Sequence, residues 1–127
     1  MKRVIIAAQN TLVSEVIAHA LKTRELLVEK ALSDTPDGIA DLCDVFLADV
    51  LIMDVTRFGS GTFENRMQTA DAVRRSNEKI RVCLVCDNVS DSELSYKVAN
   101  AKKMGIVDAF FYQSVPSDYI ADVINTM

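Results

Sequence analysis

Five short apolar runs alternate along the chain with longer stretches of helical periodicity. The runs are rich in Val, Ile, Leu and Phe and span residues 3–8, 26–32, 49–55, 80–86 and 108–113. Runs of this length suit strands that are buried on both faces, as in a parallel sheet. Strands that alternate strictly with helices predict an α/β fold: a doubly wound, five-stranded parallel sheet with helices on both faces.

The stretches between these runs repeat apolar residues at helical spacing. The second stretch is the best marked, because Thr35 can serve as N-cap, Pro36 takes the first helical position, and apolar residues follow at i, i+3, i+4, i+7 and i+8 from Ile39. Ser90 and Glu93 form a capping box that opens the fourth helix. The first helix is expected to bury Leu12, Val13, Val16, Ile17, Ala20 and Leu21. The second is expected to bury Ile39, Leu42, Cys43, Phe46 and Leu47, and the third Phe63, Met67, Ala70 and Val73.

Length and composition limit what the chain can be. Its 127 residues include only 2 Pro and 4 Gly, which predicts one compact domain over residues 1–127. A net charge of −4 argues against a nucleic-acid-binding surface, which needs a basic stripe to neutralise phosphates. No apolar run approaches the roughly 18 residues that a membrane span requires. Three Cys without disulfide-framework spacing fit a reducing cytoplasm, where we expect this domain to act.

The third apolar run, "DVLIMDV", ends on a carboxylate, that of Asp54. In doubly wound sheets the functional crevice lies beyond the carboxyl ends of the strands, so we expect Asp54 at that crevice. There it could act as a metal ligand, a phosphoryl acceptor or an orienting hydrogen-bond partner. It could equally be a structural residue that accepts backbone N–H groups from a neighbouring loop. Spacing alone leaves both interpretations open.

Several segments resemble the receiver domain of two-component response regulators, and together they cover nearly the whole chain. "DVLIMDVT" resembles that family's third strand, "AAQNTLVSEVI" the loop and helix after its first, "SNEKIRVCLVC" the approach to its fourth, and "KKMGIVDAFFYQ" the turn into its fifth. The resemblance implies a receiver or flavodoxin-like fold and a signalling role without enzyme activity. It also puts Asp54 at the position that accepts a phosphoryl group from a histidine kinase.

The positions that support phosphorylation in that family differ here. The paired acids that bind Mg²⁺ after the first strand are replaced by Ala8 and Gln9. The Thr or Ser at the end of the fourth strand is replaced by Cys86, and the Lys at the end of the fifth by Tyr112-Gln113.

Phosphoryl transfer depends on positioning and charge neutralisation, so these departures bear directly on activity. Losing one preorganised charge-stabilising group typically costs about 3 kcal/mol in a barrier. Asp54 alone is a poor Mg²⁺ ligand set, although Asp87 lies next to the expected site and could help. We therefore predict a pseudo-receiver that keeps the fold, uses no cofactor and works independently of phosphorylation. The alternative is a conventional phosphorelay receiver that is phosphorylated at Asp54 and requires Mg²⁺.

A module of this kind would act by binding a protein partner or a second copy of itself, and neither nucleic acid nor membrane. Receiver-like domains signal through the face built by the fifth strand and its flanking helices. Here that face includes Tyr96, Phe111 and Tyr119. Response regulators usually carry an output domain after the receiver, so we expect the chain to be the N-terminal piece of a longer protein. Atypical receivers also precede the ATPase domain of pilus-localisation proteins of the tight-adherence type, to which the chain has a looser resemblance.

Three further features have a structural and a functional interpretation. Cys83 and Cys86 spell C-x-x-C, but residues three apart on a strand point to opposite faces, so we expect packing rather than redox or zinc chemistry. "FGSGT" (58–62) could cradle an anion, as in a small-ligand or flavin-binding domain of flavodoxin-like shape, but it lacks the Lys of a phosphate loop and favours a connector. His19 falls off the apolar stripe and is expected at the surface.

Overall fold

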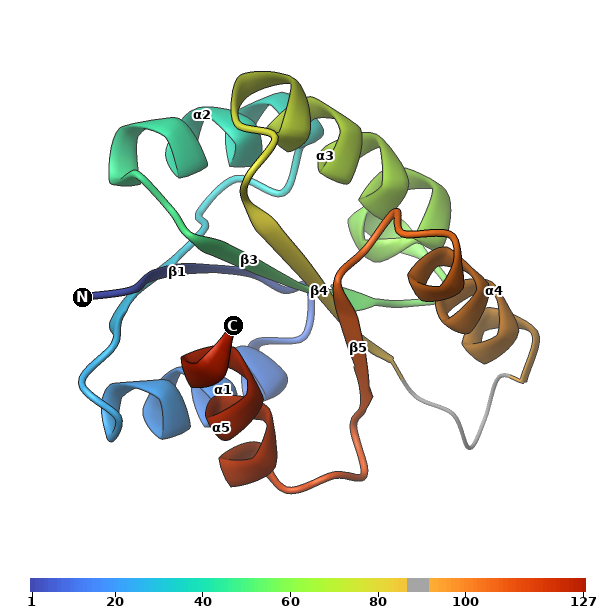
Figure 1. Cartoon of the computed structure of the whole chain (residues 1–127). Helices are drawn as coiled ribbons and strands as arrows, with labels where there is room; N and C mark the ends of the chain where they lie inside the picture. Colours follow the sequence, from blue (N-terminus) through green and yellow to red (C-terminus); the bar gives the residue numbers. More distant parts are fainter. Residues whose placement is uncertain (87–91) are drawn as a thin grey trace.

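The computed structural model describes residues 1–86 and 92–127 and shows a parallel sheet between two layers of helices (Figure 1). The strands are β1 (Arg3–Ala7), β2 (Leu27–Lys30), β3 (Val50–Val55), β4 (Arg81–Cys86) and β5 (Ala109–Tyr112). The helices are α1 (Thr11–Lys22), α2 (Pro36–Phe46), α3 (Phe63–Ser76), α4 (Ser92–Lys103) and α5 (Ser117–Thr126), and a 3₁₀ turn, η1, spans Gly59–Gly61. The sheet order is β2-β1-β3-β4-β5 with every pair parallel, which confirms the predicted fold class.

The central strand β3 is buried along its whole length and divides the core in two. Leu51, Met53 and Val55 face the layer formed by α2, α3 and α4. Val50 and Ile52 face the layer formed by α1 and α5. Alternate residues of a strand point to opposite faces, so an all-apolar run is what a sheet covered on both sides requires.

Side-chain caps fix where the first two helices begin. The Oγ1 of Thr35 accepts the Gly38 N–H at 3.1 Å, and Pro36 is the first helical residue, as predicted. The Oδ1 of Asn10 accepts the Leu12 N–H at 3.0 Å and starts α1 directly after the end of β1. The capping box predicted for α4 depends on Ser90, which lies outside the described residues.

Two of the predicted apolar stripes are partly wrong. Ile17, Ala20 and Leu21 of α1 are buried, whereas Leu12 is 71% exposed. Leu47 is also 71% exposed, because it ends α2 in the left-handed conformation, with φ of 56°, and so leaves the helical stripe.

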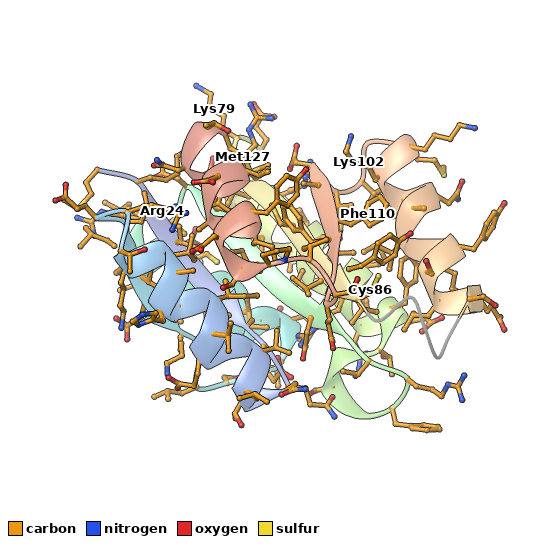
Figure 2. The ribbon with its side chains drawn as sticks, turned by 90° about the horizontal axis from the view of Figure 1, so that it is seen from below. Arg24, Lys79, Cys86, Lys102, Phe110 and Met127 are labelled. Carbon is orange, nitrogen blue, oxygen red and sulfur yellow. The ribbon has the colours of Figure 1, made fainter. Side chains whose placement is uncertain are left out.

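Helix α5 is held in place by two basic side chains from distant parts of the chain. Arg24, just after α1, donates from Nε to Asp122 Oδ1 at 2.8 Å (Figure 2). The Nζ of Lys2 donates to the Ile124 carbonyl oxygen at 2.9 Å, near the end of the helix where carbonyl groups lack intrahelical partners. Among residues 1–86 and 92–127, no helix combines the length and the apolar character needed to cross a bilayer.

Candidate functional site at Asp54

Asp54 lies near the carboxyl end of β3 and is only 1% exposed. The register pairs Met53 with Ala7, the last residue of β1, so the β1–α1 connection passes directly over Asp54. The backbone N–H of Gln9 donates to Asp54 Oδ1 at 2.9 Å, and that of Asn10 donates to Oδ2 at 2.8 Å. Asp54 therefore does what the structural interpretation requires, because both of its oxygens accept N–H groups from a neighbouring connection.

A buried arginine, which the sequence analysis missed, completes the environment of Asp54. Arg66 lies on the first half of α3, and its side chain is 0% exposed. Its Nη2 donates to Asp54 Oδ1 at 2.8 Å, and its Nε donates to the Asp54 carbonyl oxygen at 2.8 Å. Arg66 and Asp54 thus form a fully buried ion pair, in which each charge depends on the other to offset the cost of leaving water.

The third nitrogen of the Arg66 guanidinium binds a second acid. Nη1 donates to Asp34 Oδ1 at 2.8 Å, and Asp34 belongs to the connection between β2 and α2. The other oxygen of Asp34 accepts a hydrogen bond from the Ser60 hydroxyl in η1. One guanidinium therefore joins β3, α3 and the β2–α2 connection, and Asp34 extends this network to η1.

Gln9, which the resemblance places at a metal-ligand position, links the β1–α1 connection to the segment after β3. Its Oε1 accepts the Gly61 N–H at 2.9 Å and the Thr56 hydroxyl at 3.1 Å. A Cβ added at Gly59 or Gly61 would come within 2.7 Å or 3.2 Å of this oxygen, so the two glycines admit the Gln9 amide. The "FGSGT" segment thus contains the 3₁₀ turn η1 and uses the Gly61 N–H internally rather than presenting it to an anion.

Gly61→Ala is expected to lower the free energy of unfolding by about 1–3 kcal/mol, because the new Cβ would lie 2.6 Å from Thr56 Oγ1 and force the turn apart. Urea denaturation measures the change. Adding Thr56→Ala should recover part of the loss, since it removes the clashing atoms. A Gly61→Ala variant as stable as the wild type would contradict this close approach.

The other positions singled out by the resemblance also lie at the carboxyl end of the sheet. Cys86 is fully buried at the end of β4 and pairs with Val55 on one side and Tyr112 on the other (Figure 2). The Tyr112 hydroxyl accepts a hydrogen bond from Ser95 of α4 at 3.2 Å. Ala8 is half-buried, and Gln113 is exposed with its N–H donated to the Cys86 carbonyl oxygen at 2.9 Å. The structure brings these positions together around the Asp54 end of the sheet.

The described residues around Asp54 do not fit a Mg²⁺ ion. The Oδ1 of Asp54 is engaged by Arg66 and Gln9, and Oδ2 by Asn10. The Gln9 amide oxygen is used within the fold, and Ala8 has no donor atom. Asp87, which the sequence suggested as a further ligand, lies outside the described residues. In the part of the chain that the structure describes, no group of three His, Cys, Asp or Glu side chains could hold a metal ion.

The structure confirms the core packing predicted for Cys83 and Cys86 and the surface position predicted for His19. Cys83 packs in the core beneath α1 and α5, whereas Cys86 packs in the core beneath α2, α3 and α4, so the C-x-x-C sulfurs do not converge. His19 is exposed on α1. Burial raises the pKa of the Cys83 thiol to about 12, with the Asp108 charge adding to the effect. Burial likewise raises the pKa of Cys43 to about 12.

The raised thiol pKa values predict a loss of stability at alkaline pH. From the ordinary value of 9.0 up to about 12, unfolded thiols release protons that the folded chain retains, so the free energy of unfolding falls as pH rises. The slope should reach up to about 1.4 kcal/mol per pH unit for each thiol. Denaturation between about pH 8 and 10 measures it. A Cys43→Ala/Cys83→Ala variant should show a flatter profile; an identical profile would contradict the assignment.

The predicted interface residues differ in their exposure. Tyr96 is 73% and Tyr119 is 55% exposed, but Phe111 is only 6% exposed and packs its ring edge-on against Tyr119, with the ring centroids 6.2 Å apart. Phe111 therefore supports the Tyr119 ring from beneath and lines a hollow of this face, but it exposes little of its own surface. Phe110 and Lys102 lie on the α4 side of β5, the edge strand (Figure 2). Whether this face binds a partner stays a prediction.

Solved structures of receiver proteins share this fold. No family model matches the sequence, and no curated protein matches it. An orphan response regulator of H. pylori is 17% identical with a TM-score of 0.73, over 98% of this chain and 94% of that one. A CheY-like protein, TadZ, from Pseudomonas aeruginosa is 13% identical with a TM-score of 0.73, over 99% and 92% of the two chains. TrrA, a response regulator from Thermotoga maritima in complex with Mg²⁺ and BeF, is 13% identical with a TM-score of 0.73, over 99% and 98%.

Proposed function

We propose that this chain, which has the CheY-like receiver fold, is a signalling module that binds a protein partner in a state not set by phosphorylation of Asp54. The buried Asp54–Arg66 ion pair carries this proposal. In a phosphoryl-accepting site the carboxylate must offer one oxygen to phosphorus and another to the metal. Here both oxygens are already engaged by groups of the chain itself.

The energetic barrier to phosphorylation has two parts. Freeing Asp54 Oδ1 requires Arg66 to leave, and breaking a buried charge pair costs about 3–5 kcal/mol. The replaced positions remove charge stabilisation as well, at about 3 kcal/mol for each lost group. Since 1.36 kcal/mol in a barrier changes a rate tenfold, each part alone slows phosphorylation by roughly a hundredfold or more. Together they make acceptance of phosphate negligible on the timescale of signalling.

The structural similarities support a signalling role of receiver type. One similar structure is described as an orphan response regulator and another as the CheY-like TadZ. The looser resemblance to pilus-localisation proteins of the tight-adherence type points the same way, with an ATPase domain as one candidate output. In such an arrangement the receiver-like domain works as a docking or dimerisation unit.

The proposed binding face is built by α4, β5 and α5. It presents the exposed rings of Tyr96 and Tyr119, and aromatic residues dominate the energetics of many protein interfaces. Between the two helices, the edge strand β5 leaves a hollow of about 320 Å³. The hollow is lined by Lys102, Ala109, Phe110, Phe111, Tyr112, Val115, Tyr119 and Val123. A hollow with exposed aromatic residues on an edge strand suits a protein partner, and we propose a second copy as the first one to test.

Incubation with acetyl phosphate and Mg²⁺, followed by intact mass measurement, tests independence from phosphorylation. We expect no phosphate-sized mass gain in the wild type, with TrrA, whose structure contains Mg²⁺ and BeF, as the positive control. A mass gain that disappears in Asp54→Ala would overturn the proposal in favour of a conventional phosphorelay. A mass spectrum recorded under native conditions tests the small-ligand alternative, since a co-purified ligand would appear as added mass.

A further inference from the structure

A carboxylate from a strand and a carboxylate from a connection meet at a single positive group in this site. Asp54 comes from β3 and Asp34 from the β2–α2 connection, and the Arg66 guanidinium binds one oxygen of each at 2.8 Å. Divalent cations join acidic side chains from different loops in the same way, with carboxylate oxygens as their preferred ligands. The site thus has the acids of a cation-bridged arrangement and a side chain in the position of the cation.

We propose that Arg66 takes the place of a divalent cation in this chain, as a resident counter-ion that holds the connections around Asp54 in one fixed arrangement. The inference rests on the proposed function and deepens it, because it names the side chain that holds the site in place of a metal ion or a phosphoryl group. The charge is built into α3, so no metal and no phosphoryl group are needed to bring β3 and the β2–α2 connection together.

Arginine suits this role better than lysine would. The guanidinium is planar and presents several N–H groups in a rigid fork, so it can bind two acids at once. The Nε–H bond to the Asp54 carbonyl oxygen, at 2.8 Å, fixes the plane of the fork against the strand. A lysine ammonium is a point charge on a flexible stem and could not reproduce all three contacts in the same geometry.

The guanidinium and a cation would compete for the same atoms. Arg66 uses Asp54 Oδ1 and Asp34 Oδ1, and its side chain fills the buried space between them. In the wild type, a cation therefore finds neither free oxygens nor room. Without the guanidinium, the two carboxylates lose the counter-charge between them and remain neighbours, which favours the uptake of a divalent cation from solution.

Chemical denaturation of Arg66→Ala with and without Mg²⁺ tests the inference. We expect Mg²⁺ to leave the wild type unchanged but to raise the folding equilibrium constant of Arg66→Ala, by about tenfold when Mg²⁺ exceeds its dissociation constant about tenfold. The gain should vanish in Arg66→Ala/Asp34→Asn. The matched control is Arg75→Ala on the same helix, whose side chain is 72% exposed and pairs with Asp71 at the surface. No response of Arg66→Ala to Mg²⁺ would overturn the inference.

A second variant keeps the test decisive if Arg66→Ala does not fold. Arg66→Lys keeps the charge but loses the bridge, so Asp34→Asn should destabilise the wild type and have little effect in Arg66→Lys. An equal cost in both backgrounds would overturn the bridging role. The two proposals fail separately: phosphorylation of the wild type at Asp54 would remove the proposed function, whereas equal Asp34→Asn costs or a Mg²⁺-insensitive Arg66→Ala would remove only this inference.

Discussion

Replacing Arg66 with methionine is expected to lower the free energy of unfolding by about 3–5 kcal/mol at neutral pH. The methionine fills much of the space but leaves Asp54 as a buried charge. Among the described residues, its remaining donors are the Gln9 and Asn10 N–H groups. It also leaves the Asp54 carbonyl oxygen without its Arg66 partner. Urea denaturation monitored by circular dichroism measures the loss, and a domain of ordinary stability could lose a large part of its total.

Two further variants separate the ion pair from general damage to α3. Arg75→Met removes an exposed arginine from the same helix, and we expect a change within about 0.5 kcal/mol because its pair with Asp71 is solvated. Adding Asp54→Asn to Arg66→Met removes the buried negative charge, so the double variant should be more stable than the sum of the single costs predicts. Strictly additive costs, or a loss below about 1 kcal/mol for Arg66→Met, would show that the pair is not coupled.

The fold could be predicted because its determinants are local. An uninterrupted apolar run such as residues 50–55 indicates a strand buried on both faces, and a Thr-Pro pair such as Thr35-Pro36 marks where a helix begins. Such patterns set the element order, and the order restricts the topology. The burial of Leu12 and Leu47 was predicted wrongly. Periodicity does not show which apolar residues of a first helical turn stay exposed, or where a helix ends in a left-handed residue.

The chemistry of the site could be predicted only in part, because it depends on contacts between distant residues. The position of Asp54 at the end of β3 follows from the pattern, but Arg66 joins it to Asp34, 32 residues away from Arg66 in sequence. A signal was present: Arg66 follows Phe63 by three residues and precedes Ala70 by four, which places a charge on the apolar stripe of α3. A charged residue on such a stripe needs a buried partner, and Asp54, at the end of a buried strand, was a candidate.

Gln9 illustrates a different limit. By resemblance it is only a missing metal ligand, since an amide replaces an acid. In the structure its amide oxygen instead links the β1–α1 connection to Thr56 and Gly61. The substitution of a family position therefore has a structural use that a comparison of motifs does not reveal, and it reinforces the arrangement that Arg66 holds.

Tyr119→Asp is expected to weaken self-association by about 2–4 kcal/mol, or roughly thirtyfold or more in dissociation constant, if the proposed face is a dimer interface. The change removes an exposed aromatic ring and places two new negative charges near each other across a two-fold interface. It should leave folding nearly intact, because Tyr119 lies in the first turn of α5, where an acidic side chain interacts favourably with the helix dipole. Sedimentation equilibrium at several concentrations measures the dissociation constant.

Leu12→Asp provides the matched control, because it also replaces an exposed apolar residue in the first turn of a helix, but on α1. It should change association little if the interface is built from α4, β5 and α5. The opposite pattern, with Leu12→Asp disruptive and Tyr119→Asp neutral, would place the interface on the α1 surface. There Leu12 and Val16 line a hollow of about 210 Å³ whose other wall is formed by Val115 and Ile120. A wild type that stays monomeric at every concentration would exclude a second copy as the partner and leave the face for a different protein.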